Sequence, residues 1–407
     1  MFKWSATNSI PMTVLQALDI VLSDQMAIYF PGQTVEGVII VHISEAMKMR
    51  SIKASILGYS YTAIEDPGGL RLGVLFTREK EKHLDETMVV WGDANGSEDV
   101  LAAGKYNFNF QFKLPNDAQL PSSFEYRTSH IRYEIMATID RPWKSDHLSK
   151  RAFTFLQIID VNKPPLSQPL PPKEAETSIC CLCCTSGPIT LKASIDRSGY
   201  CPGESISLKT ECINNTNTDM EGIQVRLYRI DSRTVPGRTI IHNEIYSKLC
   251  SDPIKELQNF TWNPAITVPV VAPTINTSKS ITVSYELQVS LTVLSGNTLE
   301  LKIPITIGTI PLHVAAPNIA NPSPGQSPPD VPPSYDAIHE AVSYDYMECV
   351  DGPYELKEID SREYVTYKLS FAPLYPCVKS SLQANNSPVT NQPTTTHVDD
   401  VAISTNQ

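Results

Sequence analysis

One stretch of this 407-residue chain, Tyr29-Phe30-Pro31-Gly32-Gln33-Thr34-Val35, recurs in altered form as Tyr200-Cys201-Pro202-Gly203-Glu204-Ser205-Ile206. A second pair follows in the same order, because YEIMATI at residues 133–139 is matched by YELQVSL at residues 285–291. Two matched segments in the same order indicate that one structural unit is present twice. Their spacing is too long for a solenoid repeat and suits a small β-sandwich. The sequence therefore predicts two copies of one β domain.

Apolar and polar residues alternate in many segments of the first three quarters of the chain. Residues 106–112 read YNFNFQF, and residues 189–195 read ITLKASI. A period of two places apolar side chains on one face of an antiparallel strand and polar side chains on the other. Residues 77–86 are charged enough to form either a short helix or an exposed strand. We expect an all-β protein with two tandem sandwich domains, followed by a tail.

Proline-rich stretches divide the chain. Residues 162–172 read NKPPLSQPLPP and predict a semi-extended linker, and residues 316–333 are again rich in Pro, Ser and Asn. Segments that are poor in large apolar residues cannot offset the entropy of ordering. The expected division is a first sandwich at 1–161, a linker with a cysteine cluster at 162–186, a second sandwich at 187–313, and a disordered tail at 314–407.

The net charge is −11 and lies mainly in the tail. From Pro311 onward there are 12 acidic and 4 basic residues, so −8 lies in the last quarter and −3 in the rest. This distribution argues against nucleic acid as a partner, which requires concentrated Lys and Arg. No apolar run is long enough to cross a membrane, and no secretory signal is visible. We expect a cytoplasmic protein whose nine cysteines are reduced thiols.

The tail contains a Pro-Pro-x-Tyr motif at Pro332, Pro333 and Tyr335. Adjacent prolines favour an extended polyproline II backbone, which docks into an aromatic groove at a small entropic cost. The tyrosine ring would fill a neighbouring slot while its hydroxyl finds a partner. The plainer interpretation is an ordinary proline-rich linker. A second, degraded copy at residues 371–376 keeps Pro373 and Tyr375 but has Ala372 in place of the first proline, so we expect weaker binding or none.

Four cysteines, Cys180, Cys181, Cys183 and Cys184, precede the second sandwich. They are open to three interpretations: inert packed thiols, lipidation near a membrane, or a metal site of knuckle spacing. A structural zinc site needs a second, separated pair, which the remaining cysteines do not supply. We therefore expect no metal and no other cofactor.

Enzyme signatures are absent from the sequence. It has no Gly-rich dinucleotide motif, no P-loop and no G-x-S-x-G elbow, and His339-Glu340 fails as a zinc protease motif because residue 343 is Ser. We expect no catalytic residues.

Together, these landmarks resemble those of the α-arrestins, the arrestin-domain-containing proteins. The resemblance runs from about Thr13 to Leu312 and includes the tail motif. It depends on the repeated Tyr-x-Pro-Gly-Gln/Glu and on further stretches: LPSSF at 120–124, IRY at 131–133, RPW at 141–143, and residues 305–312. It implies a curved pair of immunoglobulin-like sandwiches.

The same resemblance implies an adaptor that holds membrane cargo and recruits a Nedd4-family ubiquitin ligase. Pro332, Pro333 and Tyr335 match the motif that binds the ligase's WW domains, whereas Pro373 and Tyr375 match it only in part. The expected partners are those WW domains and the cytosolic parts of receptors or transporters. The expected places are the cytoplasm and, through peripheral association, the plasma membrane and endosomes.

Residues 13–20 lack the lysine pair with which visual and β-arrestins sense receptor phosphate, so sensing of that kind is not expected here. Two other functions remain open: a trafficking scaffold similar to the arrestin-fold subunit of retromer, and a thiol-dependent regulator that binds thioredoxin.

Overall fold

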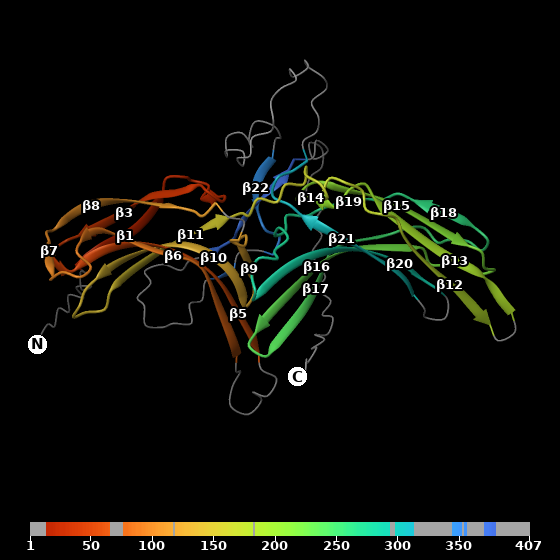
Figure 1. Cartoon of the computed structure of the whole chain (residues 1–407), viewed down its shortest axis with the longest axis horizontal. Coiled ribbons are helices and arrows are strands. Elements are labelled where there is room, and N and C mark those ends of the chain that lie inside the picture. The colour runs from red at the N-terminus through yellow and green to blue at the C-terminus, as the bar shows by residue number, and fades with distance from the viewer. Residues whose placement is uncertain are drawn as a thin grey trace, which may run out of the picture.

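The computed structural model describes residues 14–65, 76–116, 119–181, 184–293, 298–312, 344–351, 354–355 and 370–379. These residues form two β-sandwich domains placed end to end in a long, curved molecule (Figure 1). The predicted all-β fold with two tandem sandwiches is confirmed. Within the described ranges, no helix has the length and the apolar character that crossing a membrane would require.

The first domain has one three-stranded and one six-stranded sheet. The smaller sheet has the order β1 (Leu15–Leu22), β3 (Thr34–Ile43), β8 (Gly104–Lys113). The larger has the order β2 (Ile28–Tyr29), β11 (His147–Phe155), β10 (Ser129–Asp140), β5 (Ser51–Glu65), β6 (Phe76–Gly92), with β9 (Phe124–Tyr126) beside β10. Strands β4 (Met47–Met49) and β7 (Asp99–Leu101) form a small separate pair.

The second domain repeats this plan. One sheet has the order β12 (Lys173–Cys181), β13 (Cys184–Ile195), β15 (Ser205–Asn214), β18 (Asn259–Trp262), with β19 (Ala265–Thr267) also on β15. The other has the order β14 (Gly199–Tyr200), β21 (Thr298–Ile307), β20 (Ile281–Thr292), β16 (Ile223–Val235), β17 (Arg238–Cys250). In each domain a two-residue strand pairs in parallel with the last long strand, β2 with β11 and β14 with β21. The domains are therefore two copies of one topology.

The repeated Pro-Gly motif forms the same turn in both copies. The backbone N–H of Gln33 donates to the carbonyl of Phe30, and that of Glu204 donates to the carbonyl of Cys201. Gly32 and Gly203 have φ values of 77° and 83°, in the left-handed region that glycine adopts without strain. The Gln33 and Glu204 side chains each accept, at 2.8 Å, the N–H of the first turn residue. This bond explains why the repeat keeps Gln or Glu at that position.

The repeated Tyr-Glu motif also has the same role in both copies. Tyr133 on β10 and Tyr285 on β20 are buried in central strands. The Tyr133 hydroxyl donates to the carbonyl of Pro121 at 2.7 Å, and the Tyr285 hydroxyl donates to the carbonyl of Ala272 at 2.6 Å. Each hydroxyl thus fixes a loop that runs across its sheet, and the ring fills the core between the sheets.

Two local expectations are resolved by the strand pairing. Residues 77–86 belong to β6, a strand paired with β5, and not to a helix. The expected linker at 162–186 is shorter than predicted, because residues 173–181 form β12 and pair with β13. The apolar residues of β12 are too few to predict a strand from the sequence. The strand forms because its backbone pairs with β13 at the edge of the sheet.

Part of the tail is folded against the two domains. Strand β22 (Tyr344–Glu348) pairs with β25 (Leu374–Val378), and β23 (Tyr354–Glu355) pairs with β24 (Ser370–Phe371). We call residues 344–351 and 370–379 the strap; its strand β22 lies between the two domains in Figure 1. The prediction of a disordered tail at 314–407 is wrong for these residues. Two of their apolar side chains, those of Cys349 and Tyr375, are buried.

The equivalence of the two tyrosines can be tested by removing each hydroxyl. We expect Tyr133→Phe and Tyr285→Phe each to lower the free energy of unfolding by about 1–3 kcal/mol, because a buried carbonyl loses its donor. Urea unfolding of the full chain measures the effect. Tyr106→Phe is the control, since the Tyr106 hydroxyl also donates to a carbonyl, that of Ala102, but in an exposed position where water can replace it. An equal loss in all three variants would contradict the assigned role.

Candidate functional site

The predicted site residues have different positions. Pro332, Pro333 and Tyr335 lie outside the described residues, as does Cys183. The backbones of Cys181 and Cys184 pair across the turn of the β12–β13 hairpin, with Cys180 opposite Thr185. These paired ends of β12 and β13 lie at the end of the second domain that is far from the first (Figure 1). The backbones of Cys180, Cys181 and Cys184 therefore lie apart from the strap, and the chemistry of the cysteine cluster stays a prediction.

Pro373 and Tyr375, by contrast, lie in the strap and are buried. Only 1% of Tyr375 is exposed, and its hydroxyl donates to the backbone carbonyl of Ser123 at 2.9 Å. The neighbouring N–H of Leu374 donates to the Thr154 hydroxyl oxygen at 3.1 Å. Ser123 and Thr154 belong to the first domain, so this end of the strap is fixed there.

The strap is also fixed to the second domain. The N–H of Val378 donates to the carbonyl of Pro202, in the repeated turn, at 2.9 Å. The N–H of Val350 donates to the carbonyl of Val270 at 2.9 Å. The strap therefore contacts both domains through its backbone as well as through its side chains.

A buried guanidinium lies where the strap and the two domains meet. Arg229 on β16 is fully buried and forms ion pairs with Asp231 at 2.9 Å, Glu244 at 3.1 Å and Asp351 of the strap. Asp351 also accepts a hydrogen bond from the Tyr246 hydroxyl at 2.7 Å. The second domain thus supplies two carboxylates to Arg229, and the strap supplies the third.

Aromatic rings enclose the same guanidinium. Its central carbon lies 5.7 Å from the ring centre of Phe124 and 5.3 Å from that of Tyr126, both on β9 of the first domain. The Tyr246 ring of the second domain is 5.2 Å away. A cation gains from such ring faces when water is excluded. Burial alone would lower the pKa of Arg229, but Asp231 and Asp351 help to hold it well above its ordinary value, so the side chain is charged.

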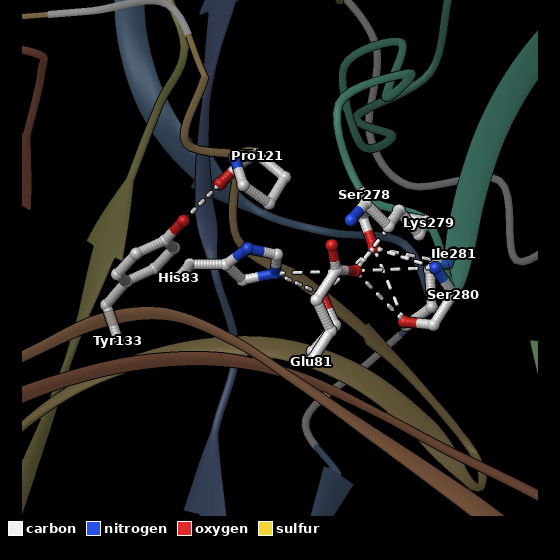
Figure 2. Close-up of polar contacts among 9 residues, drawn as sticks. Glu81, His83, Pro121, Tyr133, Ser278, Lys279, Ser280 and Ile281 are labelled. Atoms are coloured by element: carbon white, nitrogen blue, oxygen red, sulfur yellow. Dashed lines mark hydrogen bonds and ion pairs between the residues drawn. The ribbon is translucent and has the colours of Figure 1, made fainter.

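A second polar cluster joins the domains directly, and Figure 2 shows it. Glu81 on β6 accepts hydrogen bonds from the Ser278 hydroxyl at 2.8 Å, from the Lys279 N–H at 2.9 Å and from the Ser280 N–H at 3.4 Å. These donors belong to the loop that precedes β20. One carboxylate of the first domain therefore holds a loop of the second.

His83 and Ser60 complete this interdomain joint, which we define as Ser60, Glu81, His83, Ser278 and Ser280. The His83 Nε2 atom lies 2.5 Å from the Ser60 hydroxyl oxygen, and that oxygen lies 3.1 Å from the Ser278 hydroxyl oxygen. The set contains serine, histidine and glutamate, but its geometry is not that of a hydrolase triad. Glu81 approaches the same Nε2 atom at 4.0 Å, whereas a triad carboxylate holds the opposite ring nitrogen.

The electrostatics of the joint favour neutral His83 and ionised Glu81. Burial lowers the pKa of His83, and the negative charge of Glu81 opposes this effect only in part. Burial would raise the pKa of Glu81, but the hydrogen bonds from Ser278 and the loop N–H groups lower it below its ordinary value. The joint is thus a charge-assisted contact between a carboxylate and backbone donors.

Four of the described cysteines have thiols that burial makes less reactive. Burial raises the pKa of the Cys349 thiol to about 12 and that of Cys212 to about 11. It also raises the pKa of the Cys201 and Cys377 thiols above the ordinary value. Reactive cysteines need a lowered pKa, because the thiolate is the nucleophile. These four positions do not favour a thiol-dependent function.

Comparison with known proteins agrees with the duplicated topology. The sequence model of the arrestin (or S-antigen) N-terminal domain matches residues 18–162, and that of the arrestin C-terminal domain matches residues 185–312. The chain belongs to the arrestin family. Arrestin-family proteins are generally non-enzymatic adaptors in trafficking.

The relatives of this arrestin include arrestin domain-containing proteins and thioredoxin-interacting protein. It is 28% identical to arrestin domain-containing protein 4 of Mus musculus over 308 residues, 74% of each chain. It is 28% identical to arrestin domain-containing protein 17 of Caenorhabditis elegans over 314 residues, 74% of this chain and 72% of the relative. It is 23% identical to thioredoxin-interacting protein of Mus musculus over 297 residues, 72% of this chain and 74% of the relative. The predicted resemblance to α-arrestins is confirmed.

The interdomain clusters were not predicted from the sequence. For Arg229 and Asp231 a signal exists, because both occupy the buried positions of β16, in the same register as Ile223, Val225 and Leu227. Two charged residues in an apolar register indicate a buried ion pair. Glu81 gives no comparable signal, because it lies among the charged residues of β6 and its partners are far away in the sequence.

The joint predicts a specific effect of Glu81→Gln. The amide keeps an acceptor oxygen but loses the charge, so we expect hydrogen exchange at the Lys279 and Ser280 amides to become faster by about tenfold. Glu86→Gln is the control, because Glu86 lies on the same strand in an exposed position. Equal exchange in the two variants would show that Glu81 does not hold the loop.

Acid should weaken the joint. Folding lowers the pKa of both His83 and Glu81, so the unfolded chain binds protons that the folded protein does not bind. The His83 contribution is present above pH 6.5, its ordinary value, and is lost as the pH falls toward its folded pKa. The Glu81 contribution is lost at lower pH, below 4.5.

Unfolding free energies of the native protein and of His83→Gln, measured from pH 7.5 to 5, should therefore converge as the pH falls. Burial lowers the pKa of His130 to about 2, and this residue destabilises both proteins equally in acid, so its effect cancels in the difference. A difference that does not change with pH would contradict a neutral His83 in the joint.

Proposed function

We propose that this arrestin is an adaptor that brings Nedd4-family ubiquitin ligases to membrane cargo and so promotes cargo ubiquitination, endocytosis and endosomal sorting. The two arrestin domains hold the cytosolic part of a receptor or transporter. The tail binds WW domains of the ligase through Pro332, Pro333 and Tyr335. The protein works in the cytoplasm and reaches the plasma membrane and endosomes through its cargo.

The observation that carries this proposal is an intact Pro-Pro-Ser-Tyr sequence in the chain of an α-arrestin. A polyproline II segment followed by tyrosine has the chemistry that an aromatic WW groove recognises. Family membership supports the trafficking role, and the motif supports the choice of ligase. Neither observation requires a catalytic residue in this chain.

The mechanism is proximity. A weak contact between tail and WW domain and a weak contact between arrestin domains and cargo act together, because the second binding event becomes intramolecular. The ligase is then concentrated near the cargo lysines without a new strong interface. Affinity for either partner alone is expected to be modest.

Two other functions make different demands on the chain. A retromer-like trafficking scaffold needs no WW ligand, so normal sorting after deletion of residues 314–407 would favour it. A thioredoxin-binding regulator needs an accessible, reactive thiol, which the raised pKa values of Cys201, Cys212, Cys349 and Cys377 do not support.

Replacement of Tyr335 tests the adaptor function. We expect Tyr335→Ala in the full chain to weaken binding to an isolated Nedd4-type WW domain at least about tenfold, because an aromatic side chain that fills a slot usually dominates such an interface. Isothermal titration calorimetry measures the affinity.

The matched control is Tyr364→Ala, which removes a tail tyrosine that no proline precedes within three residues. The same variants, expressed in cells, should separate in cargo ubiquitination. An affinity and a ubiquitination level that do not change in Tyr335→Ala would refute the proposed recruitment.

A further inference from the structure

The strap contains the second proline–tyrosine motif, and its contacts hide the groups that a WW domain would need. Pro373 is buried and Tyr375 is 1% exposed. The Tyr375 hydroxyl is already hydrogen-bonded to the Ser123 carbonyl. A WW groove must enclose the tyrosine ring and contact its hydroxyl, so a WW domain cannot bind this motif while the strap is docked.

The strap is held by a set of contacts that belongs to both domains. We define the strap site as the groups that receive it: Ser123 and Thr154 of the first domain, and Pro202, Arg229, Tyr246 and Val270 of the second. Backbone groups accept three of these hydrogen bonds, and one ion pair fixes Asp351. The strap is thus an extended segment held through its backbone, one tyrosine and one carboxylate. Peptide ligands bind to protein surfaces through contacts of the same kinds.

The ion pair has a feature that suits a releasable contact. Arg229 keeps Asp231 and Glu244 as partners inside the second domain, so removal of Asp351 does not leave an unpaired buried charge. The outer side of the strap is exposed at Met347 and Val350, and its Asp345–Lys379 ion pair lies in solvent. The strap is thus a surface element on a site whose own charges remain balanced.

We propose that the strap is an internal peptide ligand of the strap site, and that Pro373 and Tyr375 bind a WW domain only when the strap leaves this site. The two tail motifs then differ in kind: the motif at Tyr335 binds independently of the strap, and the motif at Tyr375 is conditional. The strap site and the WW domain compete for one tyrosine. Ligases with tandem WW domains gain their second contact only after undocking.

This inference rests on the proposed function, because it assigns a WW domain as the competitor. The experiment measures, by calorimetry, the binding of an isolated Nedd4-type WW domain to the full chain with Tyr335→Ala. In this variant only the motif at Tyr375 can bind the WW domain. A synthetic peptide of residues 370–379 gives the affinity of the motif when nothing covers it. Since only the undocked fraction binds, the full chain should bind at least about tenfold more weakly than the peptide.

Release of the strap should restore binding. In the Tyr335→Ala background we expect Asp351→Asn to strengthen WW binding about tenfold, because a buried charge-assisted contact is lost. Adding Tyr375→Ala should abolish the gain. Asp345→Asn is the matched control, with the same charge change on the same strap at an exposed position. Thr154→Val, which removes the acceptor for the Leu374 N–H, is a second route to release.

Hydrogen exchange at the Val350, Leu374 and Val378 amides reports docking without a WW domain. It should become faster in Asp351→Asn and not in Asp345→Asn. Three outcomes overturn the proposal: a 370–379 peptide that does not bind, a Tyr335→Ala chain that binds as tightly as the peptide, or faster exchange without a gain in WW binding. The comparison of native and Tyr335→Ala chains tests the ligase function separately, so the two failures are distinguishable.

Discussion

A buried guanidinium needs carboxylates around it to offset the cost of losing its hydration, and the packing of both domains and the strap around Arg229 depends on this requirement. Its carboxylate partners come from β16, β17 and the strap, and the rings around it come from both domains. Burial raises the pKa of Asp231 to about 6, although the positive charge of Arg229 opposes this shift. The first domain, the second domain and the strap, which are distant from one another in the sequence, therefore meet at this one buried charge.

The second polar centre, the joint around Glu81, acts differently. It has no buried cation, and its strength comes from backbone N–H groups that a single carboxylate collects. Because these donors lie in a loop, the joint fixes the position of that loop against β6 as well as linking the domains. Among the contacts between the arrestin domains, these two differ in kind: one depends on charge pairing and includes the strap, and the other depends on loop geometry.

The sequence predicted the fold because the information is local. Alternation identified strands such as β8 and β13, and the repeated Pro-Gly and Tyr-Glu motifs identified the duplication. The prediction failed where a strand depends on distant partners. Strand β25 needs β22 and two carbonyls of other segments, and the polar composition of the tail as a whole conceals its few buried apolar residues. Tyr375 was recognised as part of a motif, but its burial follows from tertiary contacts that no local pattern records.

The repeated turn has one further consequence. In the first domain a Cβ at Gly32 would lie 2.8 Å from the Asn116 side chain, whereas at Gly203 it would lie 2.2 Å from the backbone oxygen of Val378. The two turns have the same shape, but only the second leaves its flank free for another segment of the chain. The two domains therefore differ at this turn: the turn of the second domain contacts the strap at Val378, whereas the first domain contacts the strap elsewhere, at Ser123 and Thr154.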